Sequence, residues 1–244
     1  MKLKKVLVSN EMSYKIAFAF LCLFVSSFGK DLPPFIERCG LSDPKLRNCL
    51  VRSIQNAAPS IIVPFNIPFI EIKIGDGAKI TLANSNYTAF KTMKVQDAGF
   101  DKETGEFYLK YIDAKMDAIS YYEMDIKFLG SNIKGNGPLL LNFTDSFITY
   151  TTKLKVFTDK KGIERYGVEG GKTTFSPTGA KFDFQNLFNG NESLGKATNR
   201  LLNENWKDLF GILQPTFQQV LAGIMDNAFK KYLKYVPKNA VFLP

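Results

Sequence analysis

The chain has 244 residues, of which 32 are basic, 23 are acidic and none is histidine. Without histidine it lacks the usual general base near neutral pH, the commonest metal ligand and the middle member of a Ser-His-Asp triad, which excludes most hydrolases and zinc enzymes. A hydrophobic fraction of 45% is ample for one large core and far from the composition of a disordered chain.

The first segment of the chain has the features of a secretory signal peptide. An apolar run from Ile16 to Val25 follows Lys15, and small residues stand at Ser27 and Gly29, which predicts cleavage after Gly29. The run is too short for the roughly 20 apolar residues that a membrane helix needs. We therefore expect residues 1–29 to be removed and residues 30–244 to form one secreted, extracellular domain, with 28 basic and 22 acidic residues and a net charge of +6.

Two cysteines remain beyond the predicted leader, which contains Cys22. In an oxidising compartment Cys39 and Cys49 are expected to pair, because the nine residues between them include a turn at residues 42–44 that folds the segment back. The bridge would then hold the N-terminal arm against the following helix. Two free thiols in the core are the alternative.

A helix and an extended connector are expected next. Apolar side chains at helical spacing predict a short amphipathic helix over residues 45–58, ended by Pro59. Residues 60–70 contain Pro64 and Pro68 among apolar side chains. Because proline lacks a backbone donor and disfavours helix in the residue before it, this segment is expected to be an extended, partly buried connector.

From residue 69 to residue 186 the apolar pattern has period two, which is typical of antiparallel hairpins. The strands are longer than the usual five or six residues, so the sheet is expected to curve strongly. The predicted turns are the clusters Gly75-Asp-Gly77, Asp101-Lys-Glu-Thr-Gly105, Asp159-Lys-Lys-Gly162 and Ser176-Pro-Thr-Gly179.

The apolar parity changes twice within these strands. Because a slip of one residue exchanges the two faces of a strand, each change predicts a bulge or a new packing partner. The first is expected between Tyr111 and Ile112, and the second between Phe147 and Ile148. The side chains expected to be buried are Ile112, Ala114, Met116, Ala118, Tyr122, Met124, Ile126 and Phe128 in the first run, Leu139, Leu141, Phe143 and Phe147 in the second, and Ile148, Tyr150, Leu154 and Val156 after it.

Three triplets have the form Asn-x-Ser/Thr, which marks N-glycosylation sites in secreted proteins and also arises by chance. They begin at Asn86, Asn142 and Asn191. Asn142 lies on the parity opposite Leu141 and Phe143, so its side chain is expected to face solvent.

Residues 189–236 change the apolar period from two to 3.6, which predicts one long amphipathic helix. A kink is expected at Pro215, Asn189 with Glu192 forms a plausible capping pair, and Pro237 is expected to end the helix. Some 45 residues would span on the order of 65 Å at the rise of an α-helix. A compact globule of this size needs no such rod.

A long helix against a curved sheet makes an elongated two-layer body with an apolar interface. This interface is either a filled core or a continuous hollow, and methionine among aromatic side chains suits an adaptable cavity. The candidate lining residues are Met116, Met124, Ile126, Phe128 and Phe143 on the strands, and Phe217, Leu221, Ile224 and Met225 on the helix.

Three stretches of the chain resemble the takeout and juvenile hormone binding proteins of insects: the segment from Cys39 to Cys49, the run Tyr122-Glu-Met-Asp-Ile-Lys-Phe-Leu-Gly130 with Gly135-Asn-Gly-Pro138, and Asn203-Glu-Asn-Trp-Lys-Asp-Leu209 with Pro215 and Pro237. The resemblance implies an α+β super-roll of the TULIP-like type, in which a long C-terminal helix is wrapped by a curved antiparallel sheet. It also implies an apolar tunnel for terpenoid or fatty-acyl ligands such as juvenile hormone, and a place in haemolymph or another extracellular fluid.

We therefore expect a monomeric, non-enzymatic carrier of a small lipophilic ligand, with no cofactor, no metal, no nucleic acid partner and no stable membrane insertion. The alternative is a protein that binds membrane or pathogen surfaces through its basic charge. Lysines 160 and 161, and lysines 230, 231 and 234, would contact anionic lipid in that case, or are solvated charges at a turn and a helix end. Gly135 and Gly137 resemble a phosphate loop only superficially, because no helix follows them, and a hairpin turn is the favoured interpretation.

Overall fold

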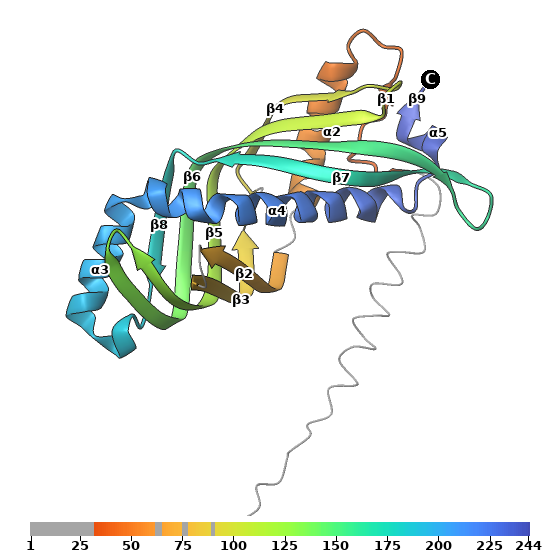
Figure 1. The fold of residues 1–244 in the computed structure, drawn as a ribbon. Coiled ribbons are helices and arrows are strands. Elements are labelled where there is room, and N and C mark those ends of the chain that lie inside the picture. The colour runs from red at the N-terminus through yellow and green to blue at the C-terminus, as the bar shows by residue number, and fades with distance from the viewer. Residues whose placement is uncertain (1–31, 62–64, 75–77, 89–90) are drawn as a thin grey trace, which may run out of the picture.

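The structure, a computed structural model, describes residues 32–61, 65–74, 78–88 and 91–244. The predicted signal peptide, with its cleavage after Gly29, lies outside the described residues, and so does the predicted turn at residues 75–77. The elements that follow can be traced in chain order in Figure 1.

The described chain forms a curved antiparallel sheet with one long helix lying along it (Figure 1). The strands are β1 (Cys39–Gly40), β2 (Phe65–Ile74), β3 (Ala78–Thr88), β4 (Met93–Phe100), β5 (Glu106–Phe128), β6 (Ser131–Thr158), β7 (Glu164–Ser176), β8 (Gly179–Phe184) and β9 (Phe242–Leu243). The helices are α2 (Leu46–Ile61), η1 (Phe188–Gly190), α3 (Glu192–Glu204), α4 (Trp206–Leu233) and α5 (Lys238–Val241).

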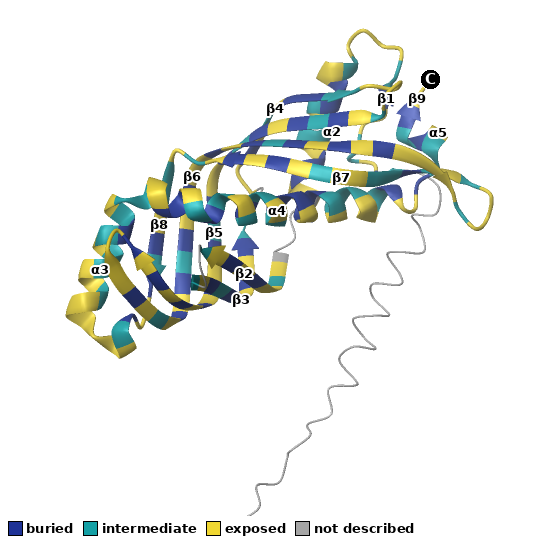
Figure 2. Cartoon of the chain, in the orientation of Figure 1, coloured by how far each residue is buried: buried dark blue, intermediate teal, exposed yellow. Residues whose placement is uncertain are grey.

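The sheet is built around β5 and β6, which have 23 and 28 residues. Its order is β2-β3-β5-β6-β7, with β4 paired to the first half of β5 and β8 paired to the first half of β6. Side chains alternate between buried and exposed along these strands, as Figure 2 shows. The long strands predicted from period-two alternation are therefore confirmed.

Both changes of buried parity occur at one level of the sheet. On β5 the buried side chains run through Asp113 and resume at Met116, and on β6 they run through Phe143 and resume at Ser146. The pairing of Asp113 with Ser146 and of Lys115 with Thr144 keeps one register across this level. The two strands thus bend together, and both halves turn their apolar faces inward.

The predicted positions of these changes were wrong by two or three residues. Ile112 is only half-buried and Ala114 is exposed, while Phe147 is 50% and Val156 is 44% exposed. Asp113 and Ser146 are polar, yet both are buried and point inward at the bend. A prediction based on apolar residues alone therefore placed the change of face at the wrong residues.

Proline limits the first helix and the first strand less than predicted. Helix α2 continues past Pro59 to Ile61, because a proline near the last turn removes only one late hydrogen bond. Residues 65–70, predicted as a connector, belong to β2. Pro68 is tolerated in β2 because β2 is an edge strand. In addition, Pro68 and Asn84 are not paired between β2 and β3, and the φ of 51° at Asn84 marks an irregularity in β3 at this point.

The strand that follows β7 does not form a hairpin with it. Both β7 and β8 pair with β6, β7 along residues 147–158 and β8 along residues 139–144. The predicted turn at Ser176–Gly179 thus interrupts the row of residues that pairs with β6, between β7 and β8. It lies at the same level as the bend of β5 and β6. The predicted turns at residues 101–105 and 159–162 do join β4 to β5 and β6 to β7.

The predicted single helix of residues 189–236 is two helices, and α3 turns away from the axis of α4 (Figure 1). The break lies at Asn205, with φ of −112° and ψ of 34°, whereas Pro215 lies inside continuous α4. The N-cap is Asn191, which accepts a hydrogen bond from the backbone N–H of Leu194, and not Asn189. With 28 residues, α4 is about 42 Å long and ends before Pro237.

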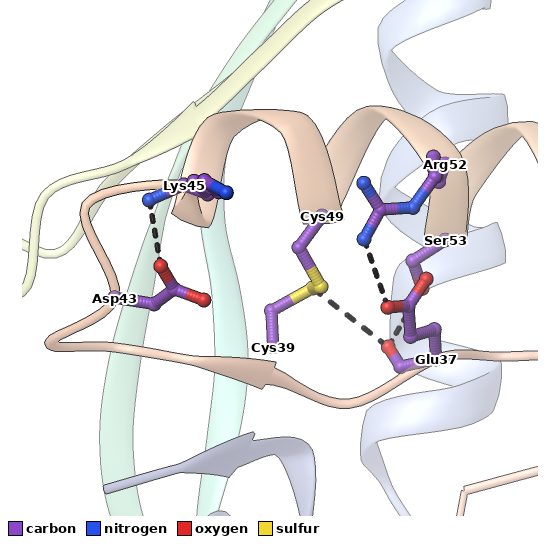
Figure 3. The surroundings of a disulfide bond; sticks show 7 residues. All are labelled: Glu37, Cys39, Asp43, Lys45, Cys49, Arg52 and Ser53. Carbon is purple, nitrogen blue, oxygen red and sulfur yellow. Dashed lines mark hydrogen bonds and ion pairs between the residues drawn. A yellow bond between two sulfur atoms is a disulfide. The ribbon is translucent and has the colours of Figure 1, made fainter.

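The bond between Cys39 and Cys49 is present, as predicted (Figure 3). It joins β1 to the first turns of α2, and β1 also pairs in parallel with C-terminal β9. The arm before α2 is therefore attached to α2 by the disulfide and to the C-terminal segment by strand pairing.

Candidate ligand-binding cavity

An apolar cavity of about 140 Å³ lies beside the disulfide, where α2, the N-terminal arm and the last turns of α4 meet the sheet. The arm, α2, β4, β5, β6, α4 and the C-terminal segment all contribute to its wall. The lining residues are Leu32, Ile36, Glu37, Cys39, Leu50, Ser53, Ile54, Ala57, Ala58, Met93, Phe107, Leu109, Leu154, Met225, Ala228, Phe229, Tyr232, Leu233, Val241 and Phe242.

Aromatic side chains set the inner wall of this cavity. Phe229 on α4 packs edge-on against Phe107 of β5, with ring centroids 5.1 Å apart, and stacks on Tyr150 of β6 at 5.6 Å. Phe242, in the C-terminal strand β9, also lines the cavity and stacks on Phe100 at a centroid distance of 5.0 Å. The void remains because α2 presents small side chains, Ala57 and Ala58, toward these rings.

The few polar groups at the cavity are satisfied by contacts within the arm and α2 (Figure 3). The hydroxyl of Ser53 donates to the backbone carbonyl of Glu37 at 2.8 Å. Arg52 donates to the Glu37 carboxylate at 3.0 Å. With the disulfide, these bonds hold the arm over the cavity, so the lining offers apolar contact and little polar recognition.

Helix α2 is attached to the sheet by side chains that bond to β4. The amide of Gln55 accepts from the backbone N–H of Val95 at 2.8 Å and donates to the carbonyl of Met93 at 3.1 Å, as a neighbouring strand would. Arg47 donates to Asp97 at 2.6 Å. Burial and then the Asp97 carboxylate raise the pKa of Tyr108, which also contacts Asp97. These contacts fix the roof of the cavity.

A polar contact inside the sheet positions α4 beside the cavity. The hydroxyl of fully buried Tyr150 donates to Asp226 at 2.7 Å. Burial, followed by this hydrogen bond, raises the pKa of Tyr150 above its ordinary value. A Cβ at position 171 would lie 1.8 Å from the Asp226 carboxylate, so a larger residue there would force that side chain to shift. This contact fixes the rotation of α4 that turns Met225 and Phe229 toward the void.

A second, smaller cavity of about 20 Å³ lies further along α4. Four of the predicted lining residues, Met116, Phe143, Phe217 and Leu221, border it. Phe143 is packed tightly there, with Phe175, Phe210 and Phe217 at centroid distances of 5.2 to 6.0 Å. This region is close to a filled core, with room for about one small group.

The nine predicted lining residues are all buried, and they divide between three places. Met225 borders the larger cavity, and four residues border the smaller one. Met124, Ile126, Phe128 and Ile224 border neither of these two cavities. The assignment of these nine residues to a ligand tunnel stays a prediction.

The larger cavity also draws on residues that the sequence analysis did not select. The apolar face of residues 45–58 and the cysteine pair were the signals available, because together they place α2 and the arm over the sheet. A cavity of this size is comparable to one of about 150 Å³ that binds benzene in an engineered protein. In the described part of the chain, no cluster of three or more metal-ligating side chains occurs. No helix in the same residues is long and apolar enough to cross a membrane.

Comparison with known proteins identifies the family. A family model described as haemolymph juvenile hormone binding protein matches residues 17–243. The chain belongs to this family. It is also similar to the circadian clock-controlled protein daywake of Drosophila melanogaster, with 22% identity over 231 residues that cover 86% of this chain and 88% of daywake.

The fold is that of a solved member of the group. The crystal structure of takeout 1 from Epiphyas postvittana matches with a TM-score of 0.77 at 19% identity, over 86% of this chain and 100% of that chain. The family and the α+β, TULIP-like super-roll predicted from the sequence are confirmed.

Proposed function

We propose that this protein is a secreted, monomeric and non-catalytic carrier of a small lipophilic molecule, and that the cavity beside the disulfide holds the ligand. The observation that carries the proposal is the nearly complete apolar lining of a void between α2 and α4. Family membership supports a carrier. Removal of the ligand's apolar surface from water would contribute roughly 25 cal/mol per Å² before ordering costs.

The size of the cavity favours a ligand with a compact apolar end. A void of about 140 Å³ accommodates a ring or a branched isoprenoid end. A terpenoid ester or a fatty-acid-like chain would place that end against Phe229 and continue along α4, toward the smaller cavity. Met225 borders the larger cavity and Leu221, one turn earlier, borders the smaller, so the chain would pass between these side chains.

The alternative of a binder of anionic surfaces has no comparable support. Lysines along the sheet have acidic neighbours, as in the pair of Lys134 with Asp125 at 2.7 Å and the pair of Lys155 with Glu169. Such pairs reduce the attraction of a surface for anionic lipid.

Solvent extraction of protein purified from culture medium, followed by mass spectrometry, tests the carrier directly. The extract should contain one class of lipophilic molecule in a stoichiometric amount. The delipidated protein should then take up a fluorescent long-chain fatty acid or a sesquiterpenoid ester with saturation at one site. A protein that carries nothing and takes up neither probe would contradict the proposal.

A further inference from the structure

The outer face of the sheet, opposite α4, carries a row of apolar side chains that are exposed or half-buried. Phe69 of β2, Ala83 of β3, Tyr121 of β5 and Pro138 of β6 are consecutive partners in the strand register. A second row begins beside it, where Ile119 of β5 pairs with Leu140 of β6. Phe69, Ile119 and Tyr121 are 59%, 57% and 56% exposed. We call these six residues the outer apolar band.

Polar side chains border the outer apolar band along both of its long sides. One side carries the row Glu71, Thr81, Glu123 and Asn136. The other carries Thr88, Asp117 and Asn142. Neighbouring side chains on one face of a sheet lie about 4.5 to 5.5 Å apart at Cβ, so the six residues form one contiguous surface. Contiguous exposed apolar surfaces on monomeric proteins usually mark a place where something binds.

Two of the three Asn-x-Ser/Thr triplets lie at this band. Asn86 stands in the second row, directly opposite Ile119. Asn142 follows two residues after Leu140 on β6, on the same face, and pairs with Asp117. Both side chains are exposed. The third, Asn191, caps α3 and belongs to no strand of the sheet.

The amide nitrogens of both side chains are accessible for modification. Nδ2 of Asn86 makes one long hydrogen bond, of 3.3 Å, to the carbonyl of Asn84. Nδ2 of Asn142 donates to Asp117 at 2.8 Å, and both partners lie at the surface. An amide with two N–H groups keeps one for this contact after the other hydrogen is replaced.

We propose that N-linked glycans on Asn86 and Asn142 lie across the outer apolar band and keep it from associating with other proteins. In this modification the Nδ2 atom displaces the diphosphate of a lipid-linked oligosaccharide at its anomeric carbon and loses one proton. The C–H faces of the first sugars then cover Ile119, Tyr121 and Leu140. The proposal rests on the secretion included in the proposed function.

The experiment uses the full chain secreted from a eukaryotic host. Peptide mapping by mass spectrometry measures occupancy at each Asn, and hydrophobic-interaction chromatography and sedimentation measure exposure of the band and self-association. The test variant is Asn86→Gln with Asn142→Gln. One control is Ser193→Ala, which removes the third triplet but keeps the Asn191 cap. The other is Thr88→Ser, which keeps the triplet at Asn86.

We expect occupancy at Asn86 and Asn142 in the native chain. The double variant should elute later and self-associate with a constant at least roughly tenfold larger, a difference of about 1.4 kcal/mol. Adding Ile119→Thr and Tyr121→Thr should reverse both effects, while the two controls should behave like the native protein. Empty sites in the secreted chain, or a double variant that behaves like the native protein, would overturn the proposal.

Ligand uptake separates this proposal from the carrier function. The band and the cavity lie on opposite faces of the sheet, so the double variant should take up the fatty-acid probe as the native protein does. A glycosylated protein that takes up no probe would contradict the carrier and leave the glycan cover intact. A protein that takes up the probe but has both glycosylation sites empty would support the carrier and overturn the glycan cover.

Discussion

Ala58 and Ala98 are both almost fully buried, but only Ala58 borders the larger cavity. Replacing Ala58 with leucine should fill part of the void, reduce uptake of the fatty-acid probe strongly and change stability by a gain of about 0.5 to 2 kcal/mol. The same replacement at Ala98 should cost about 1 to 3 kcal/mol through overpacking and leave the affinity of the folded fraction unchanged. Probe titration and thermal melts of the two variants measure both effects. Equal loss of stability at the two positions would mean that the cavity is effectively filled.

Gly171 lies against the Asp226 side chain of α4. In Gly171→Ala the new methyl group would displace the Asp226 carboxylate and break its bond to Tyr150, leaving a buried hydroxyl without its partner. We expect a loss of about 1 to 3 kcal/mol of stability in denaturant titration. The control is Gly223→Ala, where nothing lies within 4 Å of the added Cβ. That helix substitution should be neutral or stabilising. A Gly171→Ala variant as stable as this control would show that Asp226 moves freely.

At the scale of elements, α3 protects the edge of the sheet. Asn203 accepts from the backbone N–H of Phe182 at 2.8 Å and donates to its carbonyl at 2.7 Å. Asn199, one turn earlier, bonds in the same way to both backbone groups of Phe184. The two amides thus occupy the place of a further strand beside β8, which is how edge strands are kept from pairing with other chains.

Asn203→Leu should leave both backbone groups of Phe182 without a partner and cost about 1 to 3 kcal/mol. Asn203→Asp should cost less, because the carboxylate still accepts from the N–H. Thermal melts give the difference, and amide hydrogen exchange at Phe182 should accelerate in both variants. Unchanged exchange would mean that the contacts with α3 do not hold this edge.

The hairpin between β6 and β7 is held at its end by Asp159. The carboxylate accepts hydrogen bonds from Arg165 and from the backbone N–H groups of Ile163 and Lys161, and these contacts, that of Arg165 first, lower the pKa of Asp159. A lowered pKa means that the folded chain prefers the ionised form. The stabilisation is therefore complete above the ordinary value of 3.8 and is lost as the pH falls through the lower value of the folded state.

We expect exchange of the Lys161 and Ile163 amides, which lie in the turn, to accelerate relative to the amides of β6 as the pH falls below about 3.8. Asp159→Asn should show faster exchange at neutral pH and no such additional acid effect. Both measurements use pH-corrected amide exchange rates. An acid response that survives in Asp159→Asn would assign it to another group.

At the scale of the whole molecule, the disulfide links stability to ligand retention. Its loop is short, with a sequence separation of 10, for which chain entropy predicts a contribution of roughly 2 to 3 kcal/mol. Residues Leu32 and Ile36 of the arm line the cavity, so the variant Cys39→Ser with Cys49→Ser should also release a bound probe faster.

A destabilised variant at the other end of α4 provides the control for this effect. Asn203 lies in α3, and it is not part of the cavity wall. Asn203→Leu is therefore expected to lower stability and to release the probe at the native rate. Stopped-flow dilution measures both rates. Equal release from the two variants would show that the arm does not retain the ligand.

Local patterns were sufficient for much of this architecture. Period-two alternation identifies β5 and β6, and the 3.6-residue period identifies the helical C-terminal region. The two cysteines beyond the predicted leader have each other as partner. These features depend on which face of an element is apolar, and that is written in consecutive residues. The motifs around Cys39 and Asn203 were also enough to indicate the family.

Three features were decided only by contacts between distant segments. The helix breaks at Asn205 where Asn199 and Asn203 bind the backbone of β8, and a helical period contains no sign of that partner. The sheet changes face at a bend shared by β5 and β6, where buried Asp113 and Ser146 interrupt the apolar pattern. The cavity is the volume left over when α2, α4 and the sheet have packed. No single segment encodes that volume, because it depends on the distances between all of them.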